Sequence, residues 1–339
     1  MRIEGDLKAR QGKVSRTRTR GALGRVAIST PRTRLNIQRS MRLPLVCSLA
    51  LLLSAVTALV QSTSSAPAMS QEVNSLKLQS CPAPPPQASG YHLVFSTDFN
   101  PLNLSPNSLG SYTWYNPGMW WEAPAPYKNI FLLNSMLNLV WTRGQPTADT
   151  SISTAAQDGS HYLGWHYGYF EVRMRWDTVN GAWPAIWMIP IQNITNPGGE
   201  EGELDIFEGQ GNTPDVFYGT IHDWKDNQDV ANNNCCNAYQ LPATVDLSQF
   251  HTYGVLWTSG HITWYFDNQP LNSIATYPIF DDLQQKYYLI LGSQEGANWT
   301  YGDTSGVSAS RIWMQVDWVH VWQREGSGCP AGIIEGNSE

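Results

Sequence analysis

Three carboxylic acids crowd one segment of the chain, GELDIFEG at 202–209. Glu203 and Asp205 are two residues apart, so on a β-strand both side chains point to the same face. Glu208 lies three residues beyond Asp205, and strict alternation would send its carboxylate to the opposite, apolar face. Because an unpaired buried carboxylate costs on the order of several kcal/mol, we predict a β-bulge near Ile206–Phe207 that returns Glu208 to the face of the other two acids.

This arrangement predicts a particular chemistry for the two outer acids. If both side chains lean inward by about 4 Å across about four strand steps of roughly 3.3 Å, the carboxyl groups of Glu203 and Glu208 lie about 5 Å apart. Retaining glycosidases have a separation of about 5–5.5 Å, and inverting enzymes need roughly 6.5–9.5 Å. Crowding also raises at least one pKa, so that one carboxyl can stay protonated while another is ionised. The alternative is a calcium site or a solvated acidic edge, although the interleaved apolar residues argue against the edge.

The segments that must position these acids have the period-two pattern of β-strands, and no segment sustains a 3.6-residue period. Thr258-Ser259-Gly260 is typical of a hairpin turn between two of them. Many strands separated by turn signals predict an all-β fold, a β-sandwich. The expected strands are Tyr91–Phe95, Met136–Thr142, Gly168–Trp176, Asp215–His222, Phe250–Trp257, His261–Phe266, Tyr287–Leu291 and Ile312–Trp322.

Composition and charge exclude several classes of protein. The 339 residues are 42% hydrophobic and 14% charged, against about 25% charged in an average soluble domain, so the chain buries a core and is not globally disordered. Residues 1–42 hold 12 of the 21 Lys and Arg and 2 of the 28 Asp and Glu, which leaves 9 basic and 26 acidic residues in the remainder. Because the chain after residue 42 is so acidic, it is a poor binder of nucleic acid, and no nucleic-acid partner is expected.

The N-terminal part has the three-part plan of a secretory signal peptide. An apolar, uncharged stretch at 43–60 follows a basic segment and precedes small residues that end at Ala68. Cleavage there predicts a secreted, extracellular protein with no stable membrane association; a signal-anchor is the alternative. The expected organisation is an N-terminal extension with signal peptide at 1–68, a Pro-rich linker at 69–88, a catalytic domain at 89–325 and a C-terminal tail at 326–339.

Four cysteines remain after the expected cleavage, namely Cys81, Cys235, Cys236 and Cys329. Cys81 and Cys329 bracket the domain and are candidates for a bridge in an oxidising compartment. Cys235 and Cys236 are adjacent and could pair with each other. All three connectivities stay open, so the prediction is a disulfide bond without an assigned pattern. No CxxC or His/Cys spacing indicates zinc.

The acidic motif resembles the catalytic signature of glycoside hydrolase family 16, in the laminarinase-like, bulged ExDxxE form. Other segments are similar to the family's motifs in the family's order, and the resemblance covers about residues 91–323. They are YGYFEVRM at 167–174, WPAIWM at 183–188, GTIH at 219–222, FHTYGVLW at 250–257 and VDWVHV at 316–321.

The resemblance implies a concanavalin-like jelly-roll β-sandwich with a concave glycan-binding cleft and double-displacement hydrolysis. Carried over by position, Glu203 is the nucleophile, Glu208 is the general acid/base, and Asp205 orients and tunes the nucleophile. The expected function is that of a secreted retaining endo-β-glucanase, which hydrolyses β-1,3 or β-1,3/1,4 bonds of a β-glucan polysaccharide as a monomer. Catalysis is expected to need no cofactor.

Further candidates for substrate binding are aromatic or polar residues. Trp183 and Trp187 are four residues apart, hence on one strand face, where each can stack on a sugar ring or pack in the core. Trp299 is similar to a sugar-platform residue of the family. The resemblance places His222 near the acid/base, with a structural hydrogen bond as the alternative. Arg173 is a candidate for hydrogen bonds to sugar hydroxyls or for a salt-bridged surface ladder.

The resemblance also implies one metal-binding candidate, and the sequence departs from the family's motifs at two places. Asp317 occupies the position from which relatives bind a structural calcium ion on the convex side. Gly209-Gln210-Gly211 follows the last acid where relatives have a run such as Met-Glu-Tyr, and Asp223-Trp224 follows GTIH where many have a small residue. Both departures bear on subsite specificity. Rival functions are a transglycosylase of the same fold and a non-catalytic carbohydrate-binding sandwich, which would have no need for the three acids.

Overall fold

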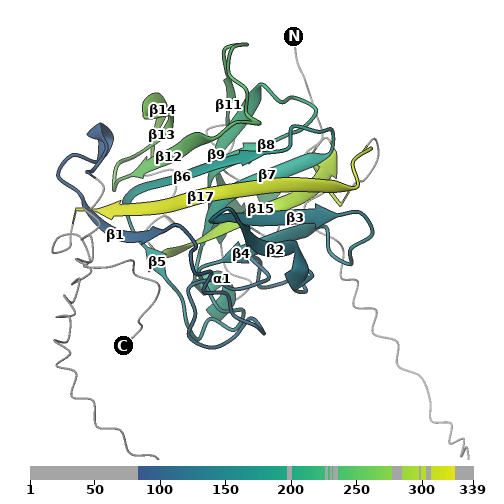
Figure 1. The fold of residues 1–339 in the computed structure, drawn as a ribbon. Helices are drawn as coiled ribbons and strands as arrows, with labels where there is room; N and C mark the ends of the chain where they lie inside the picture. Colours follow the sequence, from purple (N-terminus) through teal and green to yellow (C-terminus); the bar gives the residue numbers. More distant parts are fainter. Residues whose placement is uncertain are drawn as a thin grey trace, which may run out of the picture. The chain divides into compact units, whose positions relative to one another are not determined.

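The computed structural model describes residues 83–196, 201–225, 228–229, 231, 236–276, 285–297, 299–302 and 307–324, all within one compact unit. These residues form two antiparallel β-sheets that pack face to face (Figure 1). Helix is confined there to α1 (Gln192–Thr195) and two 3-10 turns, η1 (Pro86–Ala88) and η2 (Tyr127–Asn129). The predicted all-β sandwich is confirmed.

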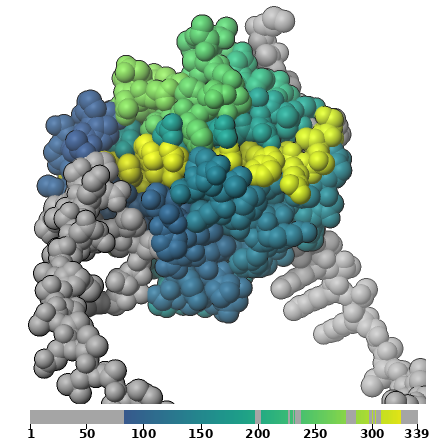
Figure 2. All heavy atoms as spheres, in the orientation of Figure 1, coloured from purple at the N-terminus to yellow at the C-terminus, as the bar shows by residue number. Residues whose placement is uncertain are grey.

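The first sheet has eight strands and faces the viewer in Figure 1. In spatial order they are β14 (Gln269–Ala275), β13 (His261–Phe266), β12 (His251–Trp257), β6 (Gly168–Trp176), β17 (Arg311–Gln323), β3 (Met136–Thr142) and β2 (Ile130–Leu133), with β1 (His92–Thr97) paired to β17. Figure 2 shows the outer face of this sheet, crossed by β17 as a yellow band.

The second sheet has nine strands and lies behind the first in this view. The path runs β10 (Gln228–Asp229), β9 (Val216–Lys225), β8 (Glu201–Gly209), β7 (Ala182–Pro190), β15 (Tyr287–Ala297) and β16 (Thr300–Tyr301). Off this path, β11 (Cys236–Gln240) pairs with β9, and both β4 (Asp149–Ser153) and β5 (Gly164–Trp165) pair with β15.

The main core lies between the two sheets and follows the alternation of the strands. Val172 and Met174 of β6 point inward from the first sheet, while Met188 of β7 and Leu204 of β8 point inward from the second. Burying each such side chain contributes about 1.5–3 kcal/mol. Because Leu204 faces the core, its neighbours Glu203 and Asp205 face the outer side of the second sheet.

Each of the eight expected strands overlaps an observed strand. The observed bounds of β3, β6 and β13 equal the predicted ones, and the predicted hairpin joins β12 to β13. The other five strands differ in their bounds. The boundary between linker and domain also differs, because Ala88, expected in the linker, is fully buried against Leu93 and Trp322. The packed domain therefore begins before residue 89.

Other predictions fall on parts of the chain outside the described residues. These are the signal peptide, most of the linker, the C-terminal tail, and the side chains of all four candidate disulfide cysteines. Among the described segments, no helix has both the length and the apolar character needed to cross a membrane.

Candidate active site

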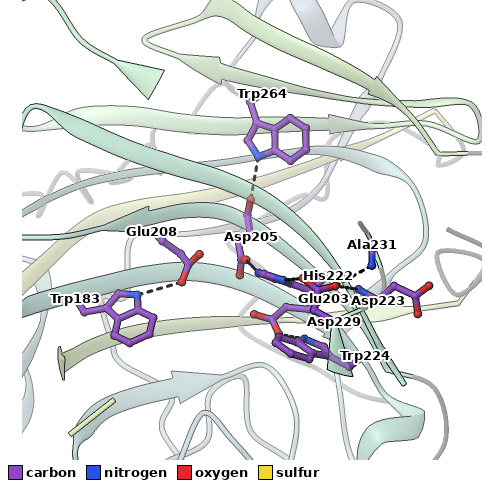
Figure 3. A network of polar contacts seen from close by, with 10 residues as sticks. All are labelled: Trp183, Glu203, Asp205, Glu208, His222, Asp223, Trp224, Asp229, Ala231 and Trp264. Atoms are coloured by element: carbon purple, nitrogen blue, oxygen red, sulfur yellow. Dashed lines mark hydrogen bonds and ion pairs between the residues drawn. The ribbon is translucent and has the colours of Figure 1, made fainter. Parts of the chain in front are cut away.

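The register of β8 confirms the predicted bulge. Glu203, Asp205 and Glu208 pair with His222, Thr220 and Tyr218, which are alternate residues of β9, and the register shifts between Asp205 and Glu208. On the other side of β8, Trp187 pairs with Asp205 and Ile186 pairs with Phe207, so Ile206 is the extra residue. All three acids therefore point to one face, as Figure 3 shows. The predicted separation of about 5 Å between the outer carboxyls stays a prediction.

A tryptophan from the first sheet holds the bulge from behind. Trp264 of β13 crosses the core, and its indole Nε1 donates a 2.9 Å hydrogen bond to the backbone carbonyl of Asp205. In Figure 3 this ring lies on the side of β8 opposite to the acids. Gly219 makes the approach possible, because a Cβ there would lie 2.4 Å from the Trp264 ring. The carbonyl displaced by the bulge thus keeps a partner, as a buried polar group requires.

Replacing Trp264 with Phe should destabilise the protein by roughly 2–4 kcal/mol, because the Asp205 carbonyl loses its donor and the core loses volume. Urea unfolding measures the change. Trp313 is a half-buried residue on the outer face of the first sheet. Its replacement with Phe is the matched control and should lower the free energy of unfolding by less than about 1 kcal/mol. Equal losses in the two variants would contradict the role of Trp264 at the bulge.

The three acids are strongly shielded from solvent. Glu203, Asp205 and Glu208 are 6%, 1% and 4% exposed, so their charges interact in a low effective dielectric. Burial, followed by the negative charges of Glu208 and Glu203, raises the pKa of Asp205 well above its ordinary value. Asp205 Oδ2 lies 3.2 Å from His222 Nε2, which opposes this shift.

His222 bridges Asp205 to a fourth acid, Asp229. Its Nδ1 lies 2.8 Å from Asp229 Oδ2. Burial by itself lowers the pKa of His222, but hydrogen bonds to Asp205 and Asp229 and the charge of Glu203 together raise this pKa well above its ordinary value. The Asp205–His222 pair therefore retains a proton at neutral pH, which moderates the repulsion among the acids.

Asp229 is itself fixed by the backbone. Its Oδ1 accepts hydrogen bonds from the amides of Asp223 at 3.2 Å and Ala231 at 3.0 Å. Burial opposes the ionised form of Asp229, but hydrogen bonding and the charge of His222 prevail and lower its pKa. Asp229 thus supports the active-site histidine from the side opposite to Asp205.

Replacing Asp229 with Asn removes one negative partner of His222. Because the folded pKa of His222 is raised, the pair's contribution to stability is fully present below pH about 6.5 and is lost as pH rises through the folded value. The variant should therefore be less stable than wild type by roughly 1.5–3 kcal/mol at pH 6, and the difference should shrink toward alkaline pH. Urea unfolding across a pH series measures it, and a pH-independent difference would argue against this coupling.

Each outer acid also accepts a hydrogen bond from an indole. Trp183 Nε1 donates to Glu208 Oε1 at 3.1 Å, and Trp224 Nε1 donates to Glu203 Oε2 at 2.7 Å (Figure 3). Trp183 is fully buried, so its observed role is to hold Glu208, which is neither of the two roles expected from the sequence. The indole donors restrict the orientation of both carboxylates.

Trp299 contacts two residues that adjoin Glu208. Its ring contacts Trp183 at 5.1 Å and Tyr218 at 4.7 Å between centroids, nearly perpendicular in both cases. Tyr218 is the register partner of Glu208 on β9. Trp299 is half-buried, so it remains the described candidate for stacking on a sugar next to Glu208.

Two of the expected positions need correction. Trp187 shares the face of the acids but is buried in an apolar cluster with Met119, Tyr288 and Ile290, so it packs instead of offering a platform. His222 lies on the side of the nucleophile candidate, because its register partner is Glu203 and its ring contacts Asp205. His222 thus lies opposite Glu203 and not opposite Glu208, and the structural hydrogen bond given as its alternative is observed.

Arg173 and Asp317 are both remote from the acids. They lie on β6 and β17, on the outer face of the first sheet, where they form an ion pair with each other. Arg173 also lies 4.7 Å above the ring of Phe250. Arg173 is therefore not placed to bind a sugar at the acids, and the alternative expected for it, a salt bridge on the surface, is observed.

The same ion pair bears on the expected calcium ion. A calcium ion at Asp317 would meet the guanidinium of Arg173 at the same carboxylate, so these residues do not fit a cation site. Among the described residues, the His, Asp and Glu side chains that could share a metal ion are Glu203, Asp205 and His222, whose ligand atoms lie within 4.8 Å of one another. Their hydrogen bonds to Trp224 and Asp229 indicate a proton network at this position.

Two residues of this network, Trp224 and Asp229, were not predicted as partners of the acids, and Trp224 was noted only as a departure from the related motif. Trp224 carried a signal, since it departs from the related motif directly after GTIH and keeps the strand parity of His222. Asp229 carried none, because it reaches His222 only through the pairing of β10 with β9.

Comparison with known proteins identifies the family. Residues 138–318, more than half of the chain, match the family model of the glycosyl hydrolases family 16. The chain belongs to this family.

The chain is similar in sequence to curated glucanases and in fold to a solved laminarinase domain. The beta-glucanase of Rhodothermus marinus is 28% identical over 254 residues, which cover 70% of this chain and 87% of that protein. The glucan endo-1,3-beta-glucosidase A1 of Niallia circulans is 24% identical over 270 residues, and the chain spans only 39% of its length. The laminarinase catalytic domain of Thermotoga maritima has 21% identity and a TM-score of 0.55, over 70% of this chain and 99% of that one. This last likeness is one of fold, the jelly-roll sandwich.

Proposed function

We propose that this protein is a secreted endo-β-glucanase that hydrolyses β-1,3 or β-1,3/1,4 glucosidic bonds with retention of configuration. The observation that carries the proposal is the bulge of β8, which turns Glu203, Asp205 and Glu208 to one face. Membership of family 16 and the names of the glucan-cleaving relatives support the substrate class. The signal-like segment at 43–60 supports secretion.

The first half of the proposed reaction forms a covalent intermediate. A carboxylate oxygen of Glu203 attacks C1 of the sugar, the bond from C1 to the leaving oxygen breaks, and Glu208 gives that oxygen its proton. The indole of Trp183 keeps the Glu208 carboxyl oriented for this transfer. Asp205 and His222, which retain a proton between them, limit the negative charge around the nucleophile.

The second half releases the sugar. Glu208, now ionised, takes a proton from a water molecule, the water oxygen bonds to C1, and the bond from C1 to Glu203 breaks. The Glu203 carboxylate is restored, with the indole of Trp224 as hydrogen-bond donor. All steps use side chains of this chain, and the proposed mechanism needs no cofactor.

A polysaccharide panel tests the substrate class. Purified protein is incubated with laminarin, mixed-linkage glucan, agarose, carrageenan and xyloglucan, and products are sized over time. We expect internal cleavage of laminarin or mixed-linkage glucan, and NMR should show the β-anomer as the first product. Longer products at high oligosaccharide concentration would favour transglycosylation, and cleavage of agarose or carrageenan alone would overturn the glucan assignment.

A further inference from the structure

Trp224 is the residue of the site that the related motifs do not account for. It lies on β9 two residues after His222, and its ring is stacked on that histidine, with 5.1 Å between centroids and an interplanar angle of 21°. Its Nε1 donates the 2.7 Å hydrogen bond to Glu203 Oε2, shorter than the 3.1 Å bond from Trp183 to Glu208. The side chain is half-buried, whereas Trp183 is fully buried.

Stacking on a fixed partner makes this donor rigid. His222 is held between Asp205 and Asp229, and Asp229 is held by two backbone amides. The indole that lies against this histidine therefore keeps its N–H aimed at Glu203. A rigid, prealigned donor stabilises charge without reorganisation when that charge forms.

We propose that Trp224 is a positioning residue that speeds release of the sugar from Glu203 by holding the nucleophile's carboxylate. In the covalent intermediate one oxygen of Glu203 is bonded to C1. When that bond breaks, the electron pair returns to the carboxylate and its charge grows, so a hydrogen bond to Oε2 strengthens in the transition state. The inference rests on the proposed function, and it assigns to Trp224 a particular step of that reaction.

The test uses Trp224→Phe, which keeps an aromatic ring on His222 and removes the N–H. The substrate is an aryl β-glucoside of a short β-1,3-glucan with a dinitrophenyl leaving group, for which sugar release limits the rate. We expect kcat to fall roughly 10- to 100-fold, KM to fall with it, and the glycosyl-enzyme to accumulate in intact-protein mass spectra. A merely structural defect would instead raise KM and leave no accumulated intermediate.

Trp183→Phe is the comparison variant, because its indole holds the other acid. The loss of activity in Trp183→Phe should depend on the leaving group. We expect kcat/KM to be reduced on laminarin and nearly unchanged on the dinitrophenyl substrate, whose leaving group departs without a proton. Trp313→Phe, on the other sheet, should leave both activities unchanged. Melting temperatures check the folding of each variant. Because Trp224 is only half-buried, Trp224→Phe is expected to fold, and it decides the inference even if Trp183→Phe does not fold.

The outcomes separate this inference from the proposed function. If wild-type protein cleaves neither laminarin nor the aryl substrate, the proposed function fails. If wild type is active and Trp224→Phe turns over the aryl substrate at the wild-type rate, or loses activity through a raised KM alone, only the inference about Trp224 is overturned.

Discussion

Replacing Glu203 with Ala should reduce kcat on laminarin by a factor on the order of 10⁴ or more while glucan binding persists. The variant keeps the bulge, since Trp264 bonds to the backbone of Asp205, and it keeps the indole of Trp183 on Glu208. What is lost is the side chain whose attack on C1 forms the covalent intermediate of the proposed mechanism.

Azide gives this prediction its stereochemical test. With Glu203→Ala and an activated aryl glycoside, azide occupies the emptied place and attacks C1 from the side of the missing carboxylate. The product should be the α-glycosyl azide. Asp246 is an exposed acid on a turn before β12. Asp246→Asn is the matched control and should hydrolyse laminarin at the wild-type rate. Unchanged hydrolysis by Glu203→Ala, or a β-azide as its product, would refute the nucleophile assignment.

Replacing Glu208 with Ala should produce a loss that depends on the leaving group. Natural glucan needs a proton on its departing oxygen, so kcat/KM on laminarin should fall roughly 10²- to 10⁴-fold. A dinitrophenyl leaving group departs without that proton, so kcat/KM on the activated substrate should remain near the wild-type value. Its kcat should still fall, because no base then activates water for the second step.

Azide again distinguishes the roles, since it needs no general base. Added to Glu208→Ala, it should restore kcat on the dinitrophenyl substrate and yield the β-glycosyl azide, formed by attack on the covalent intermediate. The opposite stereochemistry in the Glu203 and Glu208 variants is the combined signature of a double displacement. A uniform loss on both substrates with no azide product would show that Glu208 is not the acid/base.

Local pattern predicted much of the fold because strands with one buried face alternate by necessity. The bounds of β3, β6 and β13 and the hairpin after β12 came from this pattern. β4 was missed for a physical reason: Asp149 and Ser151 are buried as thoroughly as Ile152. A segment covered on both faces has no hydrophobic alternation, and its polar composition gave no other strand signal.

The bulge was also predictable, because the cost of burying Glu208 in the core left one plausible register. Arg173 shows the opposite case. Alternation along β6 puts Arg173 on the face opposite to the buried Val172 and Met174, but alternation within one strand does not say which outer face of a sandwich a residue occupies. Only the pairing of β6 with β17 places Arg173 against Asp317 and away from the acids.

The amino-acid order alone determined the acidic triad, its bulge and the family to which the chain belongs, because these depend on residue types at short spacing. The tertiary structure decided which groups surround the acids. The donors on Glu203, Asp205 and Glu208 come from β9, β13 and β7, which are brought together across sheets and registers. Hydrogen bonds and pKa values depend on distances between such distant segments, and no local spacing encodes them.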